Sequence, residues 1–158
     1  MKSHYRVVVI GGGVVGTSVL YHLAKMGWSD VCLIERSVLT AGSSWHAAGG
    51  IHALNADPNI AQLQAYTIDL LTEIEAESGQ NIGLHMTGGL TMAGTPDRWE
   101  WLQSAYRTFQ SIGIEDCRLV SVEDAVELNP IMSGEGLLGG MWADREGYID
   151  TTGTVHAY

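Results

Sequence analysis

The sequence predicts an α/β fold in which parallel strands alternate with helices. Three observations near its start predict it: a β-branched run that enters a glycine-rich turn, a helical pattern after the turn, and a second apolar run that ends in an acid. A glycine-rich turn alone also joins strand and helix in other α/β proteins. The order of all three features indicates a Rossmann-like unit, built to bind a dinucleotide.

The first strand is predicted over residues 5–10, and the glycine turn follows it at once. Gly11, Gly13 and Gly16 fit the spacing G-x-G-x-x-G. In that pattern the first glycine permits the tight turn, the second lets backbone amides approach a pyrophosphate, and the third lets the helix pack close to the strand. The amides and the positive dipole end of the helix then favour the phosphates.

The helix after the turn should present an apolar face made of Val15, Val19, Leu20, Leu23 and Met26. A second strand is predicted over residues 31–34, and Glu35 follows it, 19 residues after Gly16. That spacing suits a carboxylate that accepts ribose hydroxyls. The carboxylate disfavours a 2′-phosphate and therefore NADP, although the neighbouring Arg36 weakens this exclusion slightly.

Residues 39–50 favour FAD over NAD, a choice that the fold alone leaves open. In a plain NAD domain we expect an ordinary helix and strand here, but the segment is rich in glycine and small residues and lacks helical periodicity. Small residues let a backbone lie against a large planar ligand. Ser43 and Ser44 can donate to phosphate or cap a following turn.

The run from Glu35 to Gly49 closely resembles the dimethylglycine and sarcosine dehydrogenase branch of the D-amino acid oxidase (DAO) superfamily. By that resemblance His46 carries FAD through a covalent bond to the flavin 8α-methyl carbon. Gly50 departs from the family, which usually has leucine or a similar residue there. Motif and resemblance together place these residues at the cofactor: Gly11, Gly13, Val14, Val15, Gly16, Glu35, Arg36, Gly42, Ser43, Ser44, Trp45, His46, Ala47, Ala48, Gly49 and Gly50.

Histidine suits this attachment, because a neutral imidazole offers a nucleophilic nitrogen near neutral pH whereas lysine is mostly protonated. The plainer interpretation of His46 is a polar loop residue, and the motif around it favours attachment. His52 is interpreted as a lining or surface residue. The other histidines show no metal-like grouping and are expected to be structural or solvated; they are His4, His22, His85 and His156.

Composition agrees with an enzyme of a reducing compartment, cytoplasmic in a bacterium or in the mitochondrial matrix of a eukaryote, and not secreted. The net charge of −10 over 158 residues argues against nucleic acid and anionic membranes. No apolar run approaches the ~20 residues of a membrane helix, and the first strand starts too early to follow a signal peptide. Cys32 and Cys117 lie far apart, which predicts neither a disulfide framework nor a zinc site.

Downstream, Trp99, Leu102, Tyr106 and Phe109 recur at helical spacing. They could form an aromatic cage for a methylated amine, but the spacing favours core packing. The further elements expected are a helix from Asp57-Pro58 to about Ser78, a strand–turn–strand over 83–93, a helix from Pro96 to about Ile112, a short helix from a capping box at Ser121 to near Pro130, a strand over 137–142 and a helix capped by Asp150.

The predicted division is an FAD-binding part over 1–80, the start of an α+β substrate-binding part over 81–140, and a return segment over 141–158. The resemblance implies that the chain is the N-terminal piece of a larger flavoprotein, inactive alone. Thr151 stands where the family usually has proline. The larger members also carry a folate-binding region, so tetrahydrofolate is an expected second cofactor of the remaining part.

The resemblance implies oxidative demethylation of an N-methylated glycine, with an electron-transfer protein or oxygen as electron acceptor. It identifies no catalytic acid or base in these residues. Two alternatives stay open: an amine or amino-acid oxidase with noncovalent FAD, and a non-catalytic flavin-binding module. An NAD dehydrogenase is a more distant alternative, because residues 42–50 would have no role in it.

Overall fold

The computed structural model describes residues 2–158, which form two compact units built from interleaved segments. The first unit contains the described part of Met1–Gly49 together with Leu70–Leu84 and Tyr148–Tyr158. The second contains Gly50–Asp69 and His85–Gly147. The functional division predicted from the sequence stays a prediction.

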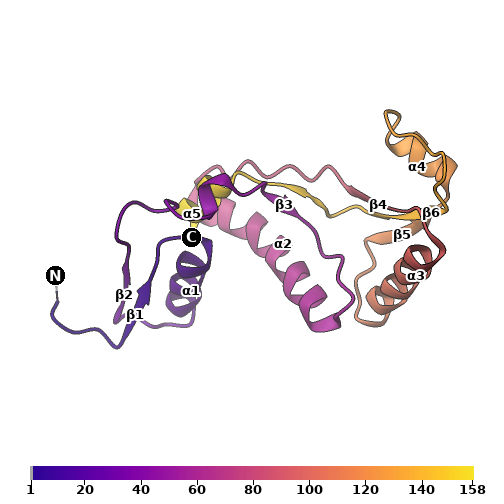
Figure 1. Cartoon of the computed structure of the whole chain (residues 1–158). Coiled ribbons are helices and arrows are strands. Elements are labelled where there is room, and N and C mark those ends of the chain that lie inside the picture. Colours follow the sequence, from indigo (N-terminus) through magenta and orange to yellow (C-terminus); the bar gives the residue numbers. More distant parts are fainter. Residues whose placement is uncertain (1) are drawn as a thin grey trace. The chain divides into compact units, whose positions relative to one another are not determined.

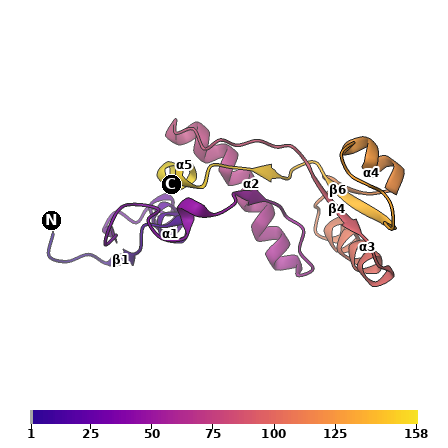
Figure 2. The same ribbon diagram turned by 45° about the horizontal axis from the view of Figure 1, so that its top comes forward.

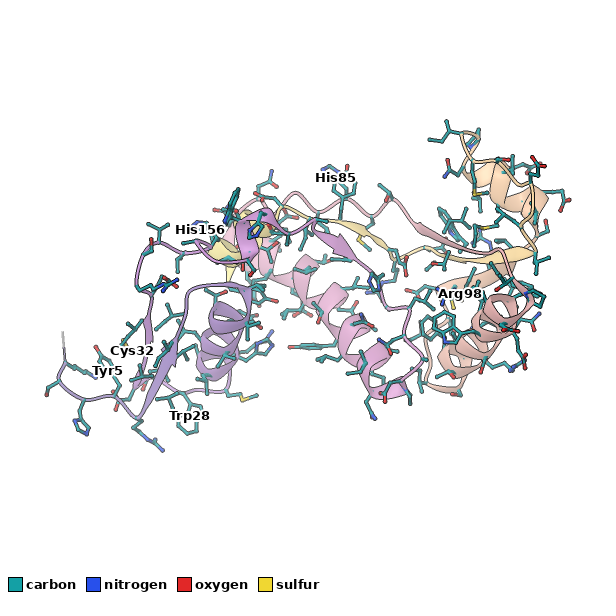
Figure 3. The ribbon with its side chains drawn as sticks, viewed as in Figure 1. Tyr5, Trp28, Cys32, His85, Arg98 and His156 are labelled. Atoms are coloured by element: carbon teal, nitrogen blue, oxygen red, sulfur yellow. The ribbon has the colours of Figure 1, made fainter. Side chains whose placement is uncertain are left out.

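The first unit begins with the expected strand–helix–strand (Figure 1). Strand β1 (Val7–Ile10) and strand β2 (Val31–Ile34) are parallel, with Val7 opposite Val31, and helix α1 (Val14–Lys25) connects them. A parallel pair requires such a crossover. The Arg6 guanidinium lies 4.7 Å from the centre of the Trp28 ring beside this pair (Figure 3).

The helix α1 forms as predicted, and most residues of its predicted apolar face are exposed in the described structure. Val15 and Met26 are 75% and 73% exposed, Val19 is also exposed, and Leu20 and Leu23 are only half-buried. In the described residues only two short strands lie in the sheet beside this helix. The side chain that α1 does bury is Thr17, whose hydroxyl donates to the Gly13 carbonyl at 3.1 Å.

The first unit also includes the end of helix α2 (Pro58–Ser78) and helix α5 (Thr151–Ala157), which packs on α1 and on the 3₁₀ turn η1 (Ser44–His46). Asp150 caps α5 as predicted, because its carboxylate accepts from the amides of Thr152 and Gly153 at 3.0 and 3.1 Å. The buried apolar side chains of this unit are Leu70, Leu71, Ile74, Ile82, Val155 and Ala157.

The second unit contains a three-stranded antiparallel sheet, and two of its strands are labelled in Figure 2. Its strands are β4 (Gly89–Ala93), β6 (Gly139–Ala143) and β5 (Cys117–Val120), with β6 in the middle. Helices α3 (Pro96–Ser111) and α4 (Val122–Leu128) pack on this sheet. Strand β5 had no counterpart in the sequence prediction.

Helix α3 places its predicted apolar residues in the core of the second unit. Leu102 and Phe109 are fully buried, and Trp99 and Tyr106 pack against them, so the structure agrees with the core interpretation of these aromatic residues. The remaining buried members of the cluster are Ala61, Ala93, Ile114, Cys117, Met141 and Ala143. Cys32 and Cys117 are both free thiols, and burial raises the pKa of Cys117 to about 11.

Only the second half of the strand–turn–strand predicted for residues 83–93 forms a strand, β4. The first half contains a single bridge at His85. Gly83 and Gly88 adopt φ values of +59° and +76°, which interrupt an extended ladder. Two further short strands, β3 (Gly50–Ile51) and β7 (Gly147–Tyr148), pair with each other.

The helix starts predicted from capping chemistry are confirmed. The Asp57 carboxylate accepts from the amides of Asn59 and Ile60 at 2.8 and 3.1 Å. Ser121 and Asp124 form the expected reciprocal capping box at α4. None of the helices within residues 2–158 is long and apolar enough to cross a bilayer.

Gly88→Ala and Gly113→Ala should separate backbone strain from side-chain overlap. Both glycines have positive φ, but an added Cβ would overlap the Trp142 ring only at Gly88. We expect Gly113→Ala to cost about 1–2 kcal/mol of unfolding free energy, and Gly88→Ala a further ~1–3 kcal/mol from overpacking. Chemical denaturation measures both, and equal losses would show that the Trp142 contact does not restrict this position.

Candidate cofactor site

The glycine turn between β1 and α1 has the geometry that its sequence predicts. Gly11 has φ +109°, and its amide donates to the Ile34 carbonyl at 2.8 Å, which closes the turn onto β2. At Gly16 an added Cβ would overlap the Gly11 carbonyl oxygen. A side chain at either position would therefore disrupt the turn.

Glu35 lies against this turn and is held by two backbone donors. The Gly12 amide donates to Oε2 at 2.7 Å, and the Ser37 amide donates to Oε1 at 2.9 Å. The hydrogen bond from Gly12, followed by that from Ser37, lowers the pKa of this carboxyl below its ordinary value of 4.5. Each carboxylate oxygen keeps a lone pair for a further donor, so the ionised side chain can still accept ligand hydroxyls.

A cleft of ≈ 590 Å³ opens beside Glu35. It brings together five predicted site residues, namely Gly11, Gly13, Glu35, Arg36 and Gly42, and adds two that the sequence prediction missed, Ser37 and Ala41. The missed pair stands directly next to predicted residues in the chain, which is the only signal that could have identified them. The volume of the cleft lies in the range of small-molecule and cofactor sites, ≈ 300–1,000 Å³.

Ser44 has a role that the sequence prediction missed. Its hydroxyl accepts from the Val14 amide at 3.0 Å, and the residue is only 8% exposed. We expected Ser44 to donate to phosphate or to cap the turn after it, but it caps the first turn of α1, 30 residues earlier in the chain. The physical reason is that Gly13, the N-cap residue, has no side chain, so a distant oxygen satisfies one of the helix's unpaired amides.

Thr40 makes a second attachment to the same turn. Its amide donates to the Gly12 carbonyl at 2.9 Å, and the side chain is buried. Its φ of +70° is rare for a β-branched residue. Such a conformation persists only where the surroundings fix it, so the entry to residues 40–49 is strongly constrained.

The far end of this segment, Gly49, is attached to the chain just before α5. The Ile149 amide donates to the Gly49 carbonyl at 2.9 Å, and a Cβ on Gly49, whose φ is +75°, would overlap the Ile149 carbonyl oxygen. We call residues 40–49 the anchored loop. It is held to the glycine turn through Thr40 and Ser44, and to residue 149 through Gly49.

His46 lies on the anchored loop with its side chain exposed. Its ring centroid is 4.8 Å from that of Trp45, with the planes tilted by 43°. The other predicted residues of this segment, Ser43, Ala47 and Ala48, are also exposed, as are Val14 and Val15 on α1. Gly50 belongs to the second unit. Within residues 2–158 no group of three or more histidine, cysteine or acidic side chains is arranged to hold a metal ion.

Glu35→Gln should reduce stability in a pH-dependent way. The side-chain amide of the glutamine would place its own N–H group against one of the two backbone donors, so we expect a lower unfolding temperature at neutral pH. Because the folded-state pKa is lowered, the stabilisation by Glu35 is present above pH 4.5 and is lost as the pH falls through the folded value. The difference between the variant and the wild type should therefore shrink below pH 4.5.

Thermal denaturation followed by circular dichroism, at a series of pH values on either side of 4.5, measures this difference. Glu100→Gln, an exposed position on α3, is the control. A deficit of equal size at every pH would contradict the assigned role of the ionised carboxylate.

The comparisons with known proteins agree with this geometry. The family of FAD-dependent oxidoreductases (DAO) matches residues 6–158. Dimethylglycine dehydrogenase of Rattus norvegicus is 36% identical over 149 residues, which cover 94% of this chain and 17% of that protein. Sarcosine dehydrogenase of Homo sapiens is 34% identical over 155 residues, which cover 98% of this chain and 17% of that protein.

Among solved structures, L-proline dehydrogenase from P. horikoshii superposes with a TM-score of 0.90 at 23% identity, over 99% of this chain and 41% of that one. This likeness confirms the α/β fold. The chain spans about 17% of the length of the two dehydrogenases named above. Because the family match extends over nearly every residue, the chain belongs to the DAO family of FAD-dependent oxidoreductases.

Proposed function

We propose that the whole protein oxidatively demethylates an N-methylated glycine of the dimethylglycine or sarcosine type, with FAD attached to His46. The observation that supports this most directly is the anchored loop. It fixes an exposed histidine to the same glycine turn that would receive the cofactor's phosphates. The names of the two dehydrogenase relatives support the substrate class.

The residues present fit FAD at several points. Gly11, Gly13 and Gly42 line the open cleft, where the backbone can approach a ligand closely. Glu35 keeps lone pairs for ribose hydroxyls. The first turn of α1 offers amides and a positive dipole end to the pyrophosphate, although the Val14 amide already bonds to Ser44 and would contribute less.

FAD held by the glycine turn, Glu35 and His46 would supply a hydride acceptor for the substrate's N-methyl carbon, with an electron-transfer protein or oxygen as the final electron acceptor. The iminium left on the substrate would hydrolyse to formaldehyde and the demethylated amine, or give its carbon to tetrahydrofolate bound elsewhere in the whole protein. His46 would hold the cofactor in place through one ring nitrogen. We assign no catalytic acid or base among these residues, and we propose the bacterial cytoplasm or the mitochondrial matrix as the compartment.

His46→Ala should abolish covalent attachment of flavin. We expect flavin fluorescence to migrate with the denatured, acid-treated wild-type polypeptide in a gel and to be absent from His46→Ala. His52→Ala is the matched control, since it removes an exposed histidine six residues further on and should retain the fluorescence. Flavin released from all three proteins on denaturation would remove the covalent assignment and favour a noncovalent oxidase.

Ser44→Ala should slow the attachment without removing the nucleophile. Loss of an N-cap oxygen costs about 1 kcal/mol, which corresponds to about a fivefold lower rate if the anchored loop must keep its conformation during bond formation. The rate is measured as fluorescent polypeptide formed over time after FAD is added to the full-length apoprotein. Ser104→Ala is the control because Ser104 is an exposed serine on α3 and is not among the predicted cofactor residues. Equal rates for the two variants would show that this cap does not position His46.

A further inference from the structure

The anchored loop ends on residues that come 100 positions later in the chain. The Ile149 amide donates to the Gly49 carbonyl at 2.9 Å. We call residues 148–158 the C-terminal segment, and it belongs to the same compact unit as the anchored loop. The loop that carries His46 is thus completed by a distant part of the chain.

Helix α5 of the C-terminal segment packs on the part of the loop that carries His46. It contacts η1 and also α1, beside which it lies in Figure 1. Three of its side chains are buried, those of Thr154, Val155 and Ala157. The turn with His46 therefore contacts α5 and, through Ser44, the first residue of α1.

The C-terminal segment is itself held firmly in this unit. The Asp150 amide donates to the Ile82 carbonyl at 2.7 Å, and the Asp150 carboxylate caps α5. At Gly153 an added Cβ would lie 2.7 Å from the Asn81 carbonyl oxygen, which leaves no space for a side chain. Helix α5 is therefore a fixed support against which the loop can be positioned.

The close fit is confined to the end of the loop that meets this support. A Cβ on Gly49 would overlap the Ile149 carbonyl oxygen and would lie 3.4 Å from Thr151 Cγ2. At Gly42, on the same loop, an added Cβ would meet no atom within 4 Å. The contact with the C-terminal segment thus restricts the conformation of the loop close to His46.

We propose that the C-terminal segment positions His46 for its bond to FAD, so that attachment occurs only after this segment has docked on the anchored loop. The inference rests on the proposed function and deepens it by giving the order of folding and attachment. A chain made only as far as residue 147 contains the glycine turn, Glu35 and His46 but lacks the support of the loop. Because a misplacement of about 1 Å lowers a rate by up to about 100-fold, such a chain should not form the bond.

The C-terminal segment contributes no atom to the attachment itself. The bond joins one imidazole nitrogen of His46 to the flavin 8α carbon. The imidazole and the 8α carbon each lose one proton, and the flavin gains two electrons, which oxygen then removes. The segment acts on this step only through the position of η1.

The first test compares two variants of the full-length apoprotein that lose the same kind of helix cap. Asp150→Ala removes the cap of α5, and Asp57→Ala removes the cap of α2, where the carboxylate also accepts from two amides. Amide hydrogen exchange reports how often residues 40–49 open. We expect Asp150→Ala to speed this exchange about fivefold, the factor that corresponds to ~1 kcal/mol for a lost N-cap.

Asp57→Ala should leave the exchange of residues 40–49 unchanged. Asp150→Asn, which keeps a capping oxygen, should restore the slow exchange. If exchange in Asp150→Ala equals that in the wild type, the loop does not depend on the C-terminal segment and the proposal is overturned.

The second test measures attachment of flavin to full-length apoprotein over a range of FAD concentrations. Gly153→Val forces α5 away from Asn81, and His156→Val places the same residue on the exposed side of α5. We expect Gly153→Val to lower the limiting rate at least about tenfold, because His46 is misplaced. The FAD concentration at half-saturation should stay unchanged, since the glycine turn and Glu35 are intact.

His156→Val should change neither value. A limiting rate in Gly153→Val equal to that of the wild type would overturn the proposal, and so would weaker FAD binding at an unchanged limiting rate. If Gly153→Val does not fold, Asp150→Ala takes its place, with the same direction expected and Asp57→Ala as its control.

Failure of the proposed function gives a different result from failure of this inference. If the wild type forms no covalent flavin, the proposed attachment at His46 is wrong. Hydrogen exchange in the apoprotein then decides alone whether the C-terminal segment fixes the anchored loop. Faster exchange in Asp150→Ala but not in Asp57→Ala supports that role, and equal exchange in both variants overturns it.

Discussion

The anchored loop depends on one hydrogen bond more than on any other, that between the Ser44 hydroxyl and the Val14 amide. It solves two problems at once. A helix that starts at a glycine has no side chain to satisfy its first amides, and a loop residue that holds a cofactor, as we propose for His46, needs a fixed position. Because Ser44 is buried against α1, the exposed His46 two residues later is positioned by the glycine turn itself.

This arrangement has a cost for anion binding. The N-terminal amides of a helix attract phosphate because they lack partners, and the amide of Val14 already has one. The Val14 amide of the turn is therefore bonded within the protein, and the other amides of the turn stay available to a ligand. Thr40, held at φ +70°, stores strain in the same loop. Both features indicate that a fixed loop conformation matters here more than the greatest number of available donors.

Local chemistry allowed much of the fold to be predicted from the sequence. The first strand–helix–strand follows from residues adjacent in the chain, as do the caps at Asp57, Ser121 and Asp150. Several features that the sequence did not predict have a common cause, since they depend on residues far apart in the chain. Ser44 caps a helix 30 residues away, Thr40 is held by Gly12, and the burial of the α1 face depends on how many strands lie beside it. Periodicity and capping patterns carry no information about such partners.

Gln64 is another residue whose surroundings could not be predicted from the sequence. Its place in a helical pattern gives no reason to separate it from Gln62, yet the fold exposes Gln62 and leaves Gln64 half-buried, with its Oε1 buried and without a hydrogen-bond partner among the described residues. An unsatisfied acceptor lowers stability, so a leucine would serve the fold better at this position. Local rules of stability therefore fail at Gln64 and Thr40, because in both places the chain keeps an arrangement that lowers stability.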